Sequence, residues 1–308
     1  MIAFLVGLHQ LLSVVYVAQA GAPVRETLSS SDNESLKNPF EHISFGARAV
    51  YVYDLLKDRV LFSKNEDERL PLASITKLMT ALTARDHMNE SSVVVLLKDD
   101  LLTEGDSGLR LGERWRLGDL LQMMLLVSSN DAATAVARYV GSGGQEDIDP
   151  LIARERFVQM MNEKADELGL ISVEFSNESG LDIKEAENDS VLVRRAGGFG
   201  SAREVAKIAS LLWKKYPDIF EITAQKDAHI VSQSDISHGL INTNEITGHI
   251  PGLMVSKTGY TDLAGGNLVV VFDIEIGHPV VAVVLGSTQK GRFEDMERIT
   301  KTVFELDN

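Results

Sequence analysis

The chain of 308 residues contains no cysteine, and this absence excludes several kinds of chemistry. Disulfide frameworks, thiol nucleophiles and thiolate metal sites all need cysteine. Positive charge is also scarce, because 30 lysine and arginine residues stand against 45 aspartate and glutamate residues, a formal charge of −15. Phosphate binding needs a positive surface, so this balance argues against a nucleic-acid partner. No metal ion or cofactor is expected either.

The rest of the composition is that of an ordinary globular protein. Hydrophobic residues make up 44% of the chain and charged residues 24%. At this length the chain can bury a core in one large domain or two small ones.

The first twenty residues form an apolar run that ends in Ala18-Gln19-Ala20. This ending fits the small-x-small cleavage pattern of a secretory signal, although the run has no lysine or arginine before its apolar core. An uncleaved anchor is the alternative, since about 20 apolar residues can span a bilayer. We expect export, with N-terminal membrane attachment as the second reading. Residues 21–41 are polar and predict a linker, so the main folded domain is expected to occupy residues 42–308.

The hydrophobic pattern predicts strands near both ends of this domain and helices between them. Expected strands are 48–54, 59–63, 93–97, 253–257, 267–276 and 279–286. Expected helices are one that starts at residue 74, a mostly helical stretch over 117–170, and the segments 202–215, 217–222 and 292–306. The order indicates an α/β fold: an antiparallel sheet built from both chain ends, flanked by helices, with an inserted, mainly helical lobe.

Ser74 and Lys77 lie at the start of an apolar helix, three residues apart. That spacing places both side chains on one face, so the lysine amine can reach the serine hydroxyl. A serine hydroxyl is a poor nucleophile at neutral pH and needs a neighbouring base. Lysine can serve if burial and a second cation lower its pKa, and Lys257 is a candidate for that cation. Alone, however, Ser-x-x-Lys is most often a capped helix with a solvated lysine.

Two further motifs follow in order along the chain. Ser128-Ser129-Asn130 lies between two apolar helical segments, and Lys257-Thr258-Gly259 ends an apolar run. Each taken singly predicts a turn or a strand end. Ser-x-x-Lys, Ser-x-Asn and Lys-Thr-Gly in this order are the signature of penicillin-binding proteins and serine β-lactamases.

With these motifs, the chain resembles serine-type D-alanyl-D-alanine carboxypeptidases, which are low-molecular-mass penicillin-binding proteins. The similarity covers roughly residues 44–306. Beyond the motifs it includes the segments 120–133, 157–169, 175–182, 252–265 and 284–287.

The resemblance implies catalytic roles for residues that match the motifs. Ser74 would be the acylated nucleophile and Lys77 its general base. Ser128 would relay a proton to the leaving amine. Asn130 would hydrogen-bond the substrate amide and help to orient Lys77.

It also implies a substrate-binding set around the last motif. Lys257 would supply positive charge, and Thr258 would bind the terminal carboxylate. Gly259 would let an extended substrate approach the strand, and the backbone N–H of Tyr260 would be the second oxyanion donor, beside that of Ser74. Arg292 resembles the family's arginine for the same carboxylate, with a solvated arginine as the alternative.

The expected activity is hydrolysis of the terminal D-Ala-D-Ala bond of peptidoglycan stem peptides outside the cytoplasm, with β-lactams as covalent inhibitors. A D,D-endopeptidase that cuts cross-links would use the same residues. A class A β-lactamase would need a Glu-x-x-Leu-Asn loop, which residues 162–169 do not supply. A non-catalytic peptidoglycan-binding protein should have lost a motif residue, and none is missing. Two departures from the family are Ser129, where glycine is common, and a long segment over 182–200.

Overall fold

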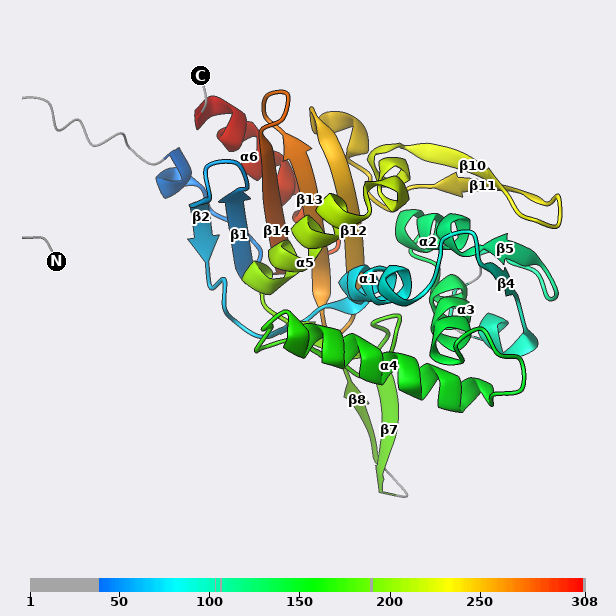
Figure 1. Ribbon diagram of the computed structural model, residues 1–308. Helices are drawn as coiled ribbons and strands as arrows, with labels where there is room; N and C mark the ends of the chain where they lie inside the picture. Colours follow the sequence, from blue (N-terminus) through cyan, green and yellow to red (C-terminus); the bar gives the residue numbers. More distant parts are fainter. Residues whose placement is uncertain (1–38, 103, 106, 189–190, 307–308) are drawn as a thin grey trace, which may run out of the picture. The chain divides into compact units, whose positions relative to one another are not determined.

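A five-stranded antiparallel sheet organises the protein (Figure 1). The computed structural model describes residues 39–102, 104–105, 107–188 and 191–306. The strand order is β12-β13-β14-β1-β2. The strands are β1 (Ala49–Asp54), β2 (Arg59–Lys64), β12 (Leu253–Thr261), β13 (Gly265–Asp273) and β14 (Pro279–Ser287). Early strands therefore pair with late ones, which confirms a sheet built from both ends of the domain.

Both faces of the sheet are covered. Along β14, Val281, Val283 and Leu285 pack into one core cluster, while Val280 and Val284 pack into the other. This alternation is what a strand with two buried faces produces. Figure 1 shows α5 across one face of the sheet and α6 across the other. The helices are α1 (Lys77–His87), α2 (Leu117–Leu126), α3 (Asn130–Gly141), α4 (Pro150–Glu167), α5 (Ala202–Lys215) and α6 (Gly291–Leu306).

Helices α1 to α4 form the inserted lobe, and local sequence sets where the helices begin. The Asp149 side chain accepts hydrogen bonds at the start of α4, where Pro150 occupies the first helical position. Ser201 and Glu204 form a capping box at the start of α5. Both are common helix-start arrangements because they satisfy backbone N–H groups that lack a partner within the helix.

Small sheets of two or three short strands complete the fold. They are β3 (Leu70–Pro71), β6 (Glu174–Phe175) and β9 (Gly198–Gly200) in one small sheet, and the pairs β4 (Val93–Val95) with β5 (Arg114–Arg116), β7 (Ile183–Asn188) with β8 (Val191–Arg195), and β10 (Asp227–Val231) with β11 (Ser237–Ile241). The hydrophobic pattern of the sequence did not predict the β10–β11 hairpin. Its exposed positions alternate with buried ones over only five residues per strand, which gives a weak signal.

Some other boundaries also differ from the expected ones. The segment 217–222 forms 3₁₀ turns, Pro217–Ile219 and Glu221–Ala224, because Pro217 starts a new element immediately after α5. The expected signal segment and most of the linker lie outside the described residues. A 3₁₀ turn, Pro39–His42, buries Phe40 at the start of the described part. Within that part no helix has the length and apolarity to cross a bilayer.

Candidate active site

Ser74 lies in a 3₁₀ helix, Ala73–Thr76, that leads directly into α1. The α-helix therefore begins at Lys77, three residues later than expected. The predicted contact nevertheless forms, because Lys77 Nζ lies 3.0 Å from Ser74 Oγ. Ala73 has a positive φ of 49°, a conformation that non-glycine residues rarely adopt, so the surrounding packing must hold this turn in place.

Lys77 is fully buried and its Nζ lies within hydrogen-bond distance of three oxygen atoms. Besides Ser74 Oγ, Nζ lies 2.7 Å from Asn130 Oδ1 and 2.8 Å from the Ser179 carbonyl oxygen. Burial lowers the pKa of Lys77 to about 7, partly opposed by the negative charge of Glu178. A large fraction of Lys77 is thus neutral near neutral pH, so its nitrogen has a lone pair that can accept a proton from Ser74.

The second motif forms the turn between α2 and α3. Ser128 has a positive φ of 61°, and Ser129 caps α3 by accepting a hydrogen bond from the backbone of Ala132. Asn130 spans the site, since its Nδ2 donates to the Glu104 carbonyl oxygen at 2.7 Å while its Oδ1 accepts from Lys77. Ser129, which stands where the family commonly has glycine, is buried, and its hydroxyl caps α3.

The third motif lies inside β12, because the strand continues to Thr261 beyond the expected end at residue 257. Lys257 Nζ donates to Ser128 Oγ and to the Thr258 carbonyl oxygen, both at 2.8 Å. Burial holds the pKa of Lys257 well below its usual range, and the charges of Lys77 and Arg292 lower it further. β12 is also an edge strand of the five-stranded sheet, so its outer edge is open to an added strand.

Gly259 brings the strand against the turn that carries the serine. A Cβ atom on Gly259 would lie 2.8 Å from the Leu72 carbonyl oxygen and 3.2 Å from the Ile75 backbone nitrogen. Real Cβ atoms do not approach a backbone oxygen so closely. In this structure the glycine is therefore required for packing between β12 and the Ser74 turn. From the sequence, the same glycine was expected to let a substrate approach the strand.

Arg292, for which a solvated arginine was the alternative, also reaches the site. It lies in the first turn of α6, is buried, and donates from Nη1 to the Gly259 carbonyl oxygen at 2.8 Å. Its Nε is buried without a hydrogen-bond partner. In the described part of the chain neither Arg292 nor Lys257 forms an ion pair, which is unusual for buried cations.

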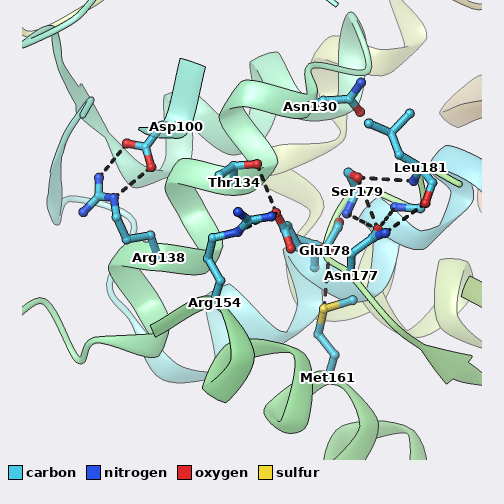
Figure 2. Close-up of polar contacts among 12 residues, drawn as sticks. Asp100, Asn130, Thr134, Arg138, Arg154, Met161, Asn177, Glu178, Ser179 and Leu181 are labelled. Carbon is cyan, nitrogen blue, oxygen red and sulfur yellow. Dashed lines mark hydrogen bonds and ion pairs between the residues drawn. The ribbon is translucent and has the colours of Figure 1, made fainter. Parts of the chain in front are cut away.

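Sequence reasoning missed two contributors. The loop 176–182 delivers the Ser179 carbonyl to Lys77, and Figure 2 shows this loop with Glu178, Arg154 and Thr134. Thr243, at the end of the β10–β11 hairpin, lies 2.6 Å from Thr258 between their hydroxyl oxygens. A backbone carbonyl carries no residue signature, and Thr243 belongs to none of the three motifs. The only signal for the loop 176–182 was the similarity of residues 175–182 to the family's sequence.

Comparison with known proteins agrees with this geometry. Residues 35–289 match the peptidase S11 family, described as D-alanyl-D-alanine carboxypeptidase. The chain belongs to this family. It is 32% identical over 221 residues to the D-alanyl-D-alanine carboxypeptidase DacF of Bacillus subtilis, a match that covers 70% of this chain and 51% of that protein. It is 30% identical to a D-alanyl-D-alanine endopeptidase of Haemophilus influenzae, covering 73% of this chain and 70% of that protein.

A solved structure has the same fold as the present chain. Penicillin-binding protein D2 of Listeria monocytogenes, in its ampicillin-bound form, superposes with a TM-score of 0.67 at 27% identity. The alignment covers 85% of this chain and 98% of that one. The chain spans about half the length of the DacF relative, so it corresponds to only part of that protein.

The long segment noted in the sequence of this peptidase-family chain folds largely as the β7–β8 hairpin. Arg194 pairs with Asp182 at 3.2 Å and with Asp262 at 2.8 Å. Thr261 Oγ1 donates to Asp182 Oδ1 at 2.9 Å, so the base of the hairpin is fixed against the end of β12. A cavity of about 380 Å³ between them is lined partly by Tyr260. The insert therefore borders the strand that carries the Lys-Thr-Gly motif.

The close approach at Gly259 makes a stability prediction. Gly259→Ala should push the Ser74 turn away from β12 and lower the melting temperature by several degrees, since overpacking costs about 1–3 kcal/mol. Gly248→Ala is the matched control, because nothing lies within 4 Å of its Cβ position. Thermal unfolding followed by circular dichroism measures both. Equal melting temperatures for the two variants would contradict the packing argument.

Proposed function

We propose that this protein removes the terminal D-alanine from D-Ala-D-Ala stem peptides of peptidoglycan through an acyl-enzyme on Ser74. One observation carries the proposal: the Ser74 hydroxyl lies beside a buried lysine whose pKa is near 7, with two further buried cations close by. A neutral amine can activate the hydroxyl, and unpaired buried cations suit a substrate that ends in a carboxylate.

In the acylation step Lys77 accepts the proton of Ser74 Oγ while the oxygen attacks the carbonyl carbon of the penultimate D-alanine. The backbone N–H groups of Ser74 and Tyr260 stabilise the resulting oxyanion. The C–N bond then breaks, and the proton that Lys77 accepted passes through Ser128 to the leaving D-alanine amine, so that Lys77 is neutral again before deacylation. Lys257 donates a hydrogen bond to Ser128 Oγ and so holds this hydroxyl in place for the transfer.

In the deacylation step Lys77 activates a water molecule that attacks the ester carbonyl, and Ser74 leaves with a proton. A class A β-lactamase requires a carboxylate base for this step. Glu178 is the carboxylate that acts on the pKa of Lys77, but its side chain is bound to Arg154 and Thr134. We therefore expect β-lactams to acylate Ser74 and to be released slowly, as covalent inhibitors.

The terminal carboxylate would be bound by Lys257, Thr258 and Arg292. Burial lowers the pKa of both cations, and a bound carboxylate would raise them again and hold the positive charge. The buried Arg292 Nε has no hydrogen-bond partner in the described part of the chain. This set distinguishes a free carboxylate from an internal amide.

An endopeptidase that cuts cross-linked stem peptides is the second candidate. The Haemophilus relative carries that name, and the match covers a larger share of its length than it does of DacF. The hairpin beside Tyr260 shapes the approach to β12 and so bears on the size of an accepted substrate. The proposed place of action in both cases is outside the cytoplasm, reached through the N-terminal segment, either cleaved or retained as an anchor.

The acyl-enzyme makes the first functional prediction. Wild-type protein incubated with benzylpenicillin should gain the mass of one penicilloyl group in intact mass spectrometry, and Ser74→Ala should gain none. Lys77→Ala should slow acylation by about three orders of magnitude or more, since members of a cooperating set are individually indispensable. Ser91→Ala, at an exposed serine, is the control. An adduct on Ser74→Ala would refute the nucleophile.

Recognition of the substrate carboxylate makes the second functional prediction. Arg292→Ala should lower kcat/KM for a pentapeptide ending in free D-Ala-D-Ala by about 10- to 100-fold, the loss of a charge-assisted hydrogen bond, and should change much less with the C-terminal amide. Arg298→Ala on the same helix, where the arginine is half exposed, is the control. An equal loss on both substrates would remove Arg292 from the binding set. Cleavage of a cross-linked dimer without D-alanine release from the pentapeptide would favour the endopeptidase.

A further inference from the structure

Glu178 is a buried carboxylate that joins three helices of the inserted lobe. It is 1% exposed, and its Oε1 accepts from Thr134 Oγ1 on α3 at 3.0 Å. The same oxygen accepts from Arg154 on α4, from Nε at 3.1 Å and Nη2 at 2.8 Å. The backbone carbonyl of Glu178 accepts from Thr80 Oγ1 on α1 at 2.6 Å. Figure 2 shows Arg154 and Thr134 converging on this side chain.

The next residue along the chain carries the carbonyl that binds Lys77. The loop is held on both sides of it, because Asn177 Oδ1 accepts from the Gly180 backbone at 2.7 Å and Asn177 Nδ2 donates to the Leu181 carbonyl at 2.9 Å. Gly180 has a φ of 80°, and a Cβ atom there would lie 1.9 Å from the Ala73 carbonyl oxygen. The loop is thus packed directly on the turn that carries the nucleophile.

We propose that Glu178 is a positioning residue for Lys77: clamped by Arg154 and Thr134, it fixes the Ser179 carbonyl that orients the amine, and its negative charge sets the pH range in which the amine acts as a base. The inference rests on the proposed acyl-enzyme function. Glu178 takes no part in the bond changes, since its side chain is bound through Oε1 to Thr134 and Arg154 on two helices.

The charge effect has a definite sign. Within the described residues, the charged groups that bear on Lys77 are Glu178, which Arg154 of α4 binds, and Lys257 of β12, which interacts electrostatically with both Lys77 and Arg292 of α6. Burial lowers the pKa of Lys77 to about 7, and Glu178 acts in the opposite direction. Lys77 must be neutral to accept the serine proton, so acylation rises with pH through that pKa. Without the charge of Glu178 the rise should occur at lower pH.

The test is the pH profile of the second-order rate constant for acylation by a chromogenic cephalosporin, followed by stopped flow. Glu178→Gln should move the acid limb by about half to one unit toward lower pH, the effect of one charge in a partly shielded site. Glu178→Asp keeps the charge but shortens the clamp, so its limb should stay in place while its plateau rate falls several-fold. This second variant keeps the proposal testable if the glutamine variant unfolds.

Asp100→Asn is the matched control. Asp100 is a second buried carboxylate of the same lobe, bound by Arg138 at 2.8 Å through two nitrogens (Figure 2). The charge that acts on the pKa of Lys77 is that of Glu178 and not that of Asp100. Asp100→Asn should lower the melting temperature but leave the acid limb in place. An unchanged limb in Glu178→Gln, or an equal shift in Asp100→Asn, would overturn the proposal. Absence of acylation in the wild type would instead refute the function on which it rests.

Discussion

The burial of the Lys77 amine is the constraint on which the site depends. A lysine removed from water is stable only if its donors are satisfied or its charge is given up. Here the amine is surrounded by the Ser74 hydroxyl, the Asn130 side chain and the Ser179 carbonyl, and its pKa falls to about 7. The same burial that costs stability creates a base suited to neutral pH.

Three separate segments must therefore meet around one nitrogen atom. The Ser74 turn, the loop before α3 and the loop 176–182 are far apart in sequence, and each reaches the amine only because the lobe packs tightly. Gly180 and Gly259 leave no room for a side chain on either side of the Ser74 turn. Ala73 and Ser128 keep positive φ angles there. Strained backbone of this kind persists only where the surrounding structure holds it in place.

Much of this arrangement follows from patterns that the sequence displays openly. The strands at both ends of the domain alternate or are wholly apolar, and the span of α5 coincides with the predicted 202–215. The i, i+3 spacing of Ser74 and Lys77 implied their contact, although it forms across a 3₁₀ turn and not within the α-helix. Side-chain identity was enough because the contact is local.

Contacts that depend on tertiary packing were not predictable in the same way. The Ser179 carbonyl is a backbone atom, so no residue type marks it, and Arg154 reaches Glu178 from a helix 24 residues earlier. The role of Gly259 in packing against the Ser74 turn depends on how β12 meets that turn. The β7–β8 and β10–β11 hairpins are short and largely polar, and such strands give little periodic signal.

The central claim is that burial lowers the pKa of Lys77 to about 7, so that a large fraction of it is neutral near pH 7 before any substrate binds. The most direct measurement is an NMR titration of the protein with isotopically labelled lysine side chains, with the Lys77 signal assigned by its loss in Lys77→Ala. The account predicts that this signal titrates near pH 7. A midpoint close to the ordinary lysine value of about 10.4 would show that Lys77 is charged when it meets Ser74, and would contradict the account.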